Sequence, residues 1–299
     1  MVTIQRILCP VDLSDTSRRA LEYAALVARW YRASLRVLLV EPVVLSSVDF
    51  PPMPAVTGLT PEARIALTRR LEQFVAGMAS PGVEVEAVVK EGYVVPEILA
   101  HAKDLPADLV VLGTHGRGGF EHLVLGSVTE KILRKLNCPV LTVPPGAGPT
   151  PAVPGPFTSI LCATDFSNAS LAALEYAVSL VQEAGIRLTV VHAIPWELEE
   201  QAELQAPVVS EYRRLREIDA RKRLDALIPQ SVREVCKVET ILTIGKPALE
   251  IQRIARDTQA DLIVLGVHGR GVVNLALFGS TTHNVIRHAP CPVLTVRAK

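Results

Sequence analysis

Short, mostly apolar runs alternate along the chain with longer segments in which apolar residues recur every three or four positions. The run 109–112 is apolar throughout, as is typical of a parallel strand buried on both faces, whereas 83–90 alternates between apolar and polar residues. Ala20, Tyr23 and Val27 have the spacing of one helical face. In the first half of the chain this pattern predicts strands at 4–11, 35–40, 83–90, 109–112 and 140–143, and helices at 16–31, 61–79, 96–103 and 127–135.

The second half of the chain repeats the first at one constant offset, which places Asp165 on Asp12. Because the match runs to the last predicted strand of each half, a whole domain has been duplicated. We expect domains at 1–143 and 157–299, and a proline- and glycine-rich linker at 144–156 that holds neither helix nor strand. The repeat predicts further strands near 158–164, 187–193, 235–242, 262–265 and 293–296, and a charged, solvated helix at 211–227.

Strands that alternate with helices predict an α/β fold with helices on both faces of a parallel sheet. We therefore expect two tandem Rossmann-like, doubly wound domains, each with a five-stranded parallel sheet in the order 3-2-1-4-5. This order brings the carboxyl ends of the first and fourth strands together at the switch point, where ligands bind in such folds. The residues that follow these two strands are the first candidates for a site.

The composition is that of an ordinary globular protein, with 49% hydrophobic and 21% charged residues, which excludes disorder over most of the length. A formal net charge of zero gives no electrostatic reason to expect nucleic acid or an acidic membrane as the partner. No apolar run is long enough to span a bilayer and the N-terminus does not resemble a signal peptide, so we expect a cytoplasmic protein. The five cysteines form no C-x-x-C pair and no zinc pattern, which favours reduced, mostly buried thiols.

Both halves carry the spacing G-x2-G-x9-G-S directly after the fourth predicted strand. Glycine lets the main chain approach a ligand closely, and the last two positions open a helix whose unpaired N–H groups favour an anion. The motif predicts a phosphate site in each half, formed by Gly113, Gly116, Gly126 and Ser127 in the first and by Gly266, Gly269, Gly279 and Ser280 in the second. Ser127 and Glu130 also fit a capping box, and glycines serve in ordinary turns; neither needs a ligand.

Each glycine motif contains a histidine and an arginine. For His115 and His268 we favour backbone positioning or ligand stacking over general-base catalysis, because no nucleophile or carboxylate is paired with them in the sequence. Arg117 and Arg270 either add charge near the phosphates or point to solvent.

An aspartate follows the first strand of each half, Asp12 in the first and Asp165 in the second. Its carboxylate can accept hydrogen bonds from a ribose hydroxyl or a base amino group across the crevice, or it can serve only as a helix cap or turn residue. A carboxylate and a glycine motif at one crevice together favour a nucleotide over a bare phosphate.

Motifs of the common nucleotide enzymes and hydrolases are absent from the sequence. No G-x-G-x-x-G follows the first strand, and neither G-x-x-x-x-G-K-[ST] nor G-x-S-x-G occurs. We therefore assign no catalytic residue and no metal ligand.

With these motifs, followed in each half by Cys-Pro-Val-Leu-Thr-Val, both halves resemble universal stress protein domains. The whole chain except the linker resembles the tandem, ATP-binding type of this family. The resemblance implies that each half binds ATP, or ADP or AMP, with Mg²⁺ held by the phosphates. It implies a nucleotide site formed by Pro10, Val11, Asp12, Val40, Gly113, His115, Gly116, Arg117, Gly126, Ser127 and Val128 in the first half, and by Ala163, Thr164, Asp165, Ala193, Gly266, His268, Gly269, Arg270, Gly279, Ser280 and Thr281 in the second.

The resemblance also implies a sensor or regulator of the stress response that acts on an unknown protein partner rather than a rapid enzyme. In this family the last strands pair, so 140–143 and 293–296 are expected to pair within the chain, with a homodimer as a further form. Two alternatives remain open at this point: a slow ATPase or nucleotidyl-transfer enzyme, and a scaffold whose nucleotide sites are vestigial.

Overall fold

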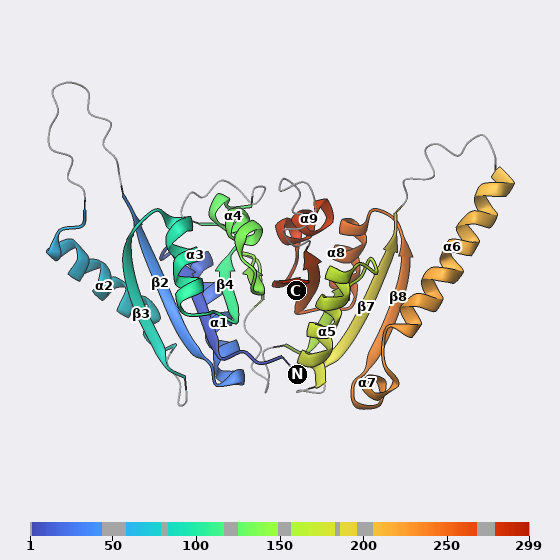
Figure 1. Cartoon of the computed structure of the whole chain (residues 1–299), viewed down its shortest axis with the longest axis horizontal. Helices are drawn as coiled ribbons and strands as arrows, with labels where there is room; N and C mark the ends of the chain where they lie inside the picture. Colours follow the sequence, from blue (N-terminus) through green and yellow to red (C-terminus); the bar gives the residue numbers. More distant parts are fainter. Residues whose placement is uncertain are drawn as a thin grey trace, which may run out of the picture. The chain divides into compact units, whose positions relative to one another are not determined.

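The computed structural model of the chain describes residues 2–43, 58–78, 83–116, 125–148, 157–182, 186–195, 206–267 and 279–298 (Figure 1). The chain divides into two compact units. The N-terminal unit is Thr3–Pro145, and the C-terminal unit is Gly146–Lys299 together with Met1–Val2. Most of the predicted linker, residues 149–156, lies outside the described residues.

The N-terminal unit has a parallel sheet in the order β3-β2-β1-β4-β5, as predicted. Four helices connect the strands, and α1 packs on β1 and β4 while α3 packs on β2. The elements are β1 (Arg6–Val11), α1 (Asp15–Tyr31), β2 (Ser34–Pro42), α2 (Pro61–Val75), β3 (Val85–Gly92), α3 (Val94–Asp104), β4 (Leu109–Gly113), α4 (Ser127–Lys135) and β5 (Val140–Val143).

The C-terminal unit repeats this topology, with the strand order β8-β7-β6-β9-β10. Its elements are β6 (Ser159–Ala163), α5 (Asn168–Gln182), β7 (Arg187–Ile194), α6 (Ala206–Ala226), α7 (Gln230–Val235), β8 (Val238–Ile244), α8 (Pro247–Asp257), β9 (Leu262–Val267), α9 (Ser280–His288) and β10 (Val293–Arg297). In both units the central strands are buried along their length, as their continuously apolar sequence predicts.

The turn that leads from β1 into α1 sets the geometry of the site. Leu13 adopts a left-handed conformation (φ 63°), which reverses the chain at the end of β1. Ser14 is the N-cap, and its hydroxyl accepts a hydrogen bond from the Ser17 N–H at 3.2 Å. Helix α1 therefore begins at Asp15, close to the carboxyl end of β1 at Val11.

Many predicted boundaries differ from the structure by one or two residues, and helix α6 begins at Ala206 rather than at 211. Helix α2 starts at Pro61 as predicted but ends at Val75 rather than 79. Helix α3 begins at Val94, two residues before the proline that the sequence suggested as its start. The sequence predicted a strand from 235, but Val235 closes the short helix α7 and β8 begins at Val238. A helix of six residues has too little periodicity to be seen in the sequence.

The described part of the chain has no helix with both the length and the apolarity needed to cross a membrane. The pairing of the two last strands across the units stays a prediction.

All five cysteines are free thiols, and Cys9, Cys162, Cys236 and Cys291 are buried. Burial raises the pKa of the Cys162 thiol to about 12, which keeps it protonated at neutral pH. Since the thiolate is the reactive form, we expect these four thiols to react slowly with a thiol reagent in the folded protein and rapidly after unfolding. Counting labelled thiols by mass spectrometry with and without denaturant tests this, and rapid native labelling of Cys162 would contradict it.

Candidate functional site

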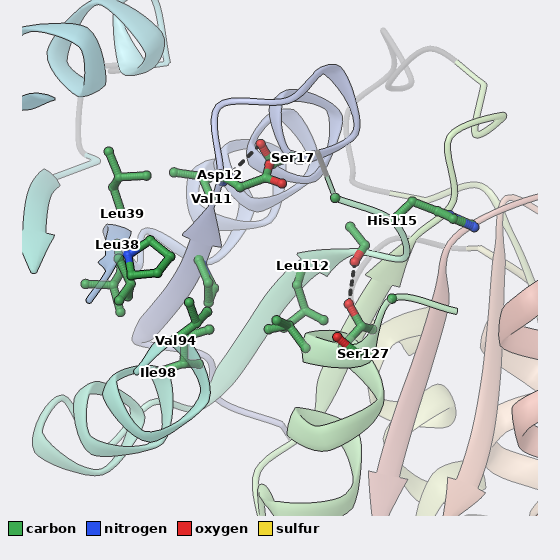
Figure 2. A pocket seen from close by; sticks show the side chains of 18 of the residues that line it. Val11, Asp12, Ser17, Leu38, Leu39, Val94, Ile98, Leu112, His115 and Ser127 are labelled. Carbon is green, nitrogen blue, oxygen red and sulfur yellow. Dashed lines mark hydrogen bonds between the residues drawn. The ribbon is translucent and has the colours of Figure 1, made fainter. Parts of the chain in front are cut away.

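A cavity of about 600 Å³ lies at the carboxyl ends of β1 and β4 in the N-terminal unit (Figure 2). It is thus at the switch point that the strand order predicts. Arg117 lies outside the described residues. The other predicted residues of this half all line the cavity: Pro10, Val11, Asp12, Val40, Gly113, His115, Gly116, Gly126, Ser127 and Val128.

One end of the cavity is apolar. Leu38 on β2 lies near Val94 and Ile98 on α3, and Leu112 on β4 lies on the side of Ser127 (Figure 2). Leu125 also lines the cavity. Sequence analysis missed these residues because their apolar pattern is the same as that of ordinary core positions. The lining residues that it missed are Ser17, Leu38, Leu39, Glu41, Pro42, Val94, Ile98, Leu112, Leu125, Thr129 and Glu130.

The Asp12 carboxylate is held in a fixed orientation at the edge of this cavity. Its Oδ1 accepts hydrogen bonds from the Ser14 N–H at 3.1 Å and from the Ser14 hydroxyl at 2.5 Å. The Asp12 N–H faces the Ser17 hydroxyl oxygen at 3.4 Å (Figure 2). Asp12 is therefore a turn residue but not the helix cap, and its Oδ2 is directed toward Gly116.

The three glycines of the motif have different roles. A Cβ on Gly113 would lie 2.8 Å from the Thr16 methyl group and 3.3 Å from two carbonyl oxygens, so this glycine lets α1 pack against β4. A Cβ on Gly126 would lie 3.1 Å from the Thr114 carbonyl oxygen. Only at Gly116 would it meet a candidate ligand-binding group, the Asp12 Oδ2 at 2.8 Å. Gly113 therefore has a packing role that the sequence did not predict, and it also lines the cavity.

The N-terminus of α4 adjoins the cavity, and no side chain of the described residues caps it. Gly126 is the N-cap residue, so the predicted capping box, which needs Ser127 at that position with Glu130, does not form. Glu130 instead accepts a hydrogen bond from Arg134 at 2.5 Å. The first turn of α4 lines the cavity, and within the described part of the chain its N–H groups have no side-chain cap.

The His115 ring lies beside Thr114, whose hydroxyl is 2.9 Å from its Nδ1. Figure 2 shows the His115 side chain pointing away from the apolar wall of Leu38, Val94 and Ile98. This geometry favours the positioning of the loop backbone over stacking on a ligand.

In the C-terminal unit the equivalent predicted residues follow β6 and β9 in the sequence. The loop that contains His268, Gly269 and Arg270 lies outside the described residues. Within the described residues, the chain reads Ala163, Thr164 and Asp165 after β6 and places Ala193 near the end of β7. Gly279 is the N-cap of α9, followed by Ser280 and Thr281, again with no side-chain cap.

Two further details distinguish the C-terminal unit. A Cβ on Gly266 would lie only 2.3–2.5 Å from main-chain atoms of Ala169 and Ser170, so this glycine is fixed by packing against α5. Burial raises the pKa of the Asp165 carboxyl, but hydrogen bonds from Ser167 and Ser170 outweigh it and the net pKa is lowered. Asp165 is thus a carboxylate at neutral pH.

Among the described residues, no cluster of three or more His, Cys, Asp or Glu side chains could hold a metal ion.

Comparisons with known proteins agree on one family. The model of the universal stress protein family matches residues 3–144 and again 156–297. A universal stress protein of Mycobacterium tuberculosis is 30% identical over 192 residues, which cover 64% of this chain and 62% of that relative. A second universal stress protein of the same organism is 26% identical over 311 residues, covering 97% of this chain and 94% of that relative.

The crystal structure of a universal stress protein from Archaeoglobus fulgidus covers 100% of this chain and 98% of its own, with a TM-score of 0.66 and 23% identity. At this identity the similarity shows the shared fold. The family model, by contrast, covers nearly all of both halves, so the chain belongs to the universal stress protein family and carries two of its domains in tandem.

Proposed function

We propose that the cavity of the N-terminal unit binds an adenine nucleotide, ATP or its products ADP and AMP. The observation that carries the proposal is the combination of groups that line one cavity: an apolar wall, the Asp12 carboxylate and the N-terminus of α4. A base, a ribose and a phosphate chain would need these three kinds of group. By the repeat, we propose an equivalent site in the C-terminal unit.

The apolar end suits a purine base, and the neighbouring main chain supports adenine. In the C-terminal unit the Thr164 N–H donates to the Val191 carbonyl at 2.9 Å, so the main-chain groups of Val191 face β6. The main-chain groups of alternate residues in a strand point to the same neighbouring strand. The N–H and C=O of Ala193 therefore point to the space beyond the end of β6. Val40 is the counterpart in the N-terminal unit, where its N–H and C=O can pair with the donor and acceptor edge of adenine.

The Asp12 carboxylate suits the sugar. Ser14 donates two hydrogen bonds to Oδ1 of Asp12, and Oδ2 lies on the side of Gly116 and the cavity. A carboxylate is an acceptor only, so it matches the hydroxyl groups of a ribose.

The first turn of α4 suits the phosphates, because its N–H groups and the helix dipole attract an anion. The described residues that line the cavity include Asp12, Glu41 and Glu130 but no lysine or arginine. A triphosphate beside three carboxylates needs a counter-ion, which supports binding as the Mg²⁺ complex with the metal held by the phosphates.

We propose that nucleotide binding makes the chain a sensor or regulator in the stress response that acts on a protein partner, in the cytoplasm, where ATP is available and thiols stay reduced. Fixed hydrogen-bonding groups without an identified nucleophile or general base support binding rather than turnover.

Binding is expected to raise stability in proportion to ligand concentration. Mg-ATP at 100 times its Kd should add about 2.7 kcal/mol to the unfolding free energy of the unit that binds it. The measurement is thermal or denaturant unfolding with Mg-ATP and, as a control, with Mg²⁺ alone. Ion-exchange chromatography of the supernatant after heat denaturation should also recover any adenine nucleotide that co-purifies. Unfolding curves that do not move with Mg-ATP would count against the proposal.

A further inference from the structure

Three side chains form a stacked group beside the candidate site of the C-terminal unit, and we call Phe166, His192 and Arg223 the clamp. The Phe166 and His192 rings have centroids 4.4 Å apart, with their planes tilted by 42°. The Arg223 guanidinium of α6 lies over the Phe166 ring, 4.1 Å from its centroid. The clamp therefore joins β7, the β6–α5 turn and α6.

The clamp holds the main chain on both sides of Asp165. His192 Nδ1 lies 2.8 Å from the Thr164 carbonyl oxygen. Since a carbonyl only accepts, Nδ1 carries the proton, and Nε2 is the nitrogen that gains a proton in acid. Phe166, on the other side of Asp165, has a left-handed backbone (φ 63°), a conformation that a bulky residue keeps only when its surroundings fix it.

The N-terminal unit provides an internal comparison. The repeat places Leu13 at the position of Phe166 and Leu39 at that of His192. Leu13 has the same φ of 63°, so the two turns have similar backbones. Neither leucine can titrate.

The charges around His192 come from two elements. Asp165 follows β6, and Arg223 and Arg216 belong to α6, where Asp219 lies 3.9 Å from Arg223. Burial lowers the pKa of His192 and the two arginines add to this effect, while the Thr164 carbonyl and Asp165 oppose it, and the net pKa is lowered.

We propose that His192 is a positioning residue for the nucleotide site of the C-terminal unit, and that protonation of its ring opens the clamp and weakens nucleotide binding there. The inference rests on the proposed nucleotide function. Protonation would place a third cation beside Arg223 and Arg216 in a half-buried site, and it would offer Asp165 a partner that competes with a ribose hydroxyl. Both effects release Asp165 from its binding orientation.

The sign follows from the direction of the pKa shift. A folded-state pKa below the unfolded value makes the clamp fully stabilising above about pH 6.5, the ordinary value for histidine. This stabilisation is lost as the pH falls from there through the lowered pKa. The C-terminal site should therefore weaken in mild acid, and the N-terminal site should not.

The test uses two variants with one nucleotide site each, and each variant is the control for the other. Asp12→Ala leaves only the C-terminal site and Asp165→Ala only the N-terminal one, so both see the same ligand with the same phosphate ionisation. The Kd for Mg-ATP is measured by calorimetry at pH 7.5 and pH 5.5. Acidification should weaken binding to Asp12→Ala more than binding to Asp165→Ala, and the ratio of the two Kd values should grow as the pH approaches the lowered pKa of His192. In the Asp12→Ala background, His192→Asn, which keeps a donor but does not titrate, should remove this difference.

A second measurement needs no nucleotide. In the ligand-free full chain, the His192 ring signal, assigned by its loss in His192→Asn, should titrate in NMR spectra below pH 6.5, and the Thr164 and Phe166 amide signals should move with the same midpoint. The clamp proposal would be overturned if the Thr164 and Phe166 amide signals did not shift as His192 titrates. It would also be overturned if the Kd for Mg-ATP had the same pH dependence at both sites. If Asp12→Ala binds no ATP at pH 7.5, the proposed function fails for this unit instead.

Discussion

Replacing Gly266 by alanine is expected to destabilise the C-terminal unit by about 3 kcal/mol, because overpacking against rigid main chain has a large cost. The new Cβ would lie 2.3 Å from the Ala169 carbonyl carbon, 2.4 Å from its oxygen and 2.5 Å from the Ser170 nitrogen. These atoms belong to the first turn of α5, which packs on β9, so they cannot move unless the helix shifts away from the sheet.

Denaturant unfolding followed by circular dichroism measures this effect, and two alanine variants calibrate it. Gly146→Ala meets no atom within 4 Å and should change stability by less than about 0.5 kcal/mol. Gly113→Ala meets a Thr16 methyl group at 2.8 Å but main-chain oxygens only at 3.3 Å, so its cost should fall between the two. A Gly266→Ala protein as stable as Gly146→Ala would mean that Gly266 is not fixed by packing.

Gly116→Ala is expected to have the opposite profile, with stability nearly unchanged and nucleotide binding at the N-terminal site weakened at least about tenfold. Gly116 is exposed and its φ is not in the left-handed region, so alanine causes no backbone strain. Its Cβ would lie 2.8 Å from the Asp12 Oδ2, and Ser14 prevents the carboxylate from turning away easily. The carboxylate would have to leave the position from which we propose that it binds ribose.

The Kd for Mg-ATP is best measured in the Asp165→Ala background, so that only the N-terminal site contributes. Ser14→Ala is a useful companion, because loss of the bond to Oδ1 should let Asp12 move and relieve part of the Gly116→Ala defect. Unchanged ATP affinity in Gly116→Ala, with a normally folded protein, would contradict the assignment of Asp12 and Gly116 to one site.

The fold can be predicted well from the sequence alone. The apolar periodicity indicates the strands and helices of one half, and the internal repeat requires the same elements in the other half. The apolar run 109–112 becomes the central strand β4, and the order of strands and helices follows from the rules for parallel sheets. Helix α7 was missed because six residues do not establish a period. Helix α2 was extended too far because its backbone leaves the helical region at Ala76 (ψ 131°) and Gly77 is left-handed (φ 84°).

The candidate site was predicted in position but not in detail. The glycine motif and Asp12 indicated the crevice in which the cavity lies, since the topology brings both to the same edge of the sheet. The apolar wall of Leu38, Val94 and Ile98 could not be distinguished from core positions. The packing role of Gly113 required the three-dimensional contact with Thr16, which a spacing rule does not contain.

The most direct test of the central claim is a crystal structure of the chain grown in excess Mg-ATP. We predict an adenosine in the N-terminal cavity, with its base against Leu38, Val94 and Ile98 and a ribose hydroxyl on Asp12. We predict its phosphates at the Ser127 end of α4. A cavity that stays empty under these conditions, or a nucleotide bound with its phosphates at the apolar end, would contradict the account.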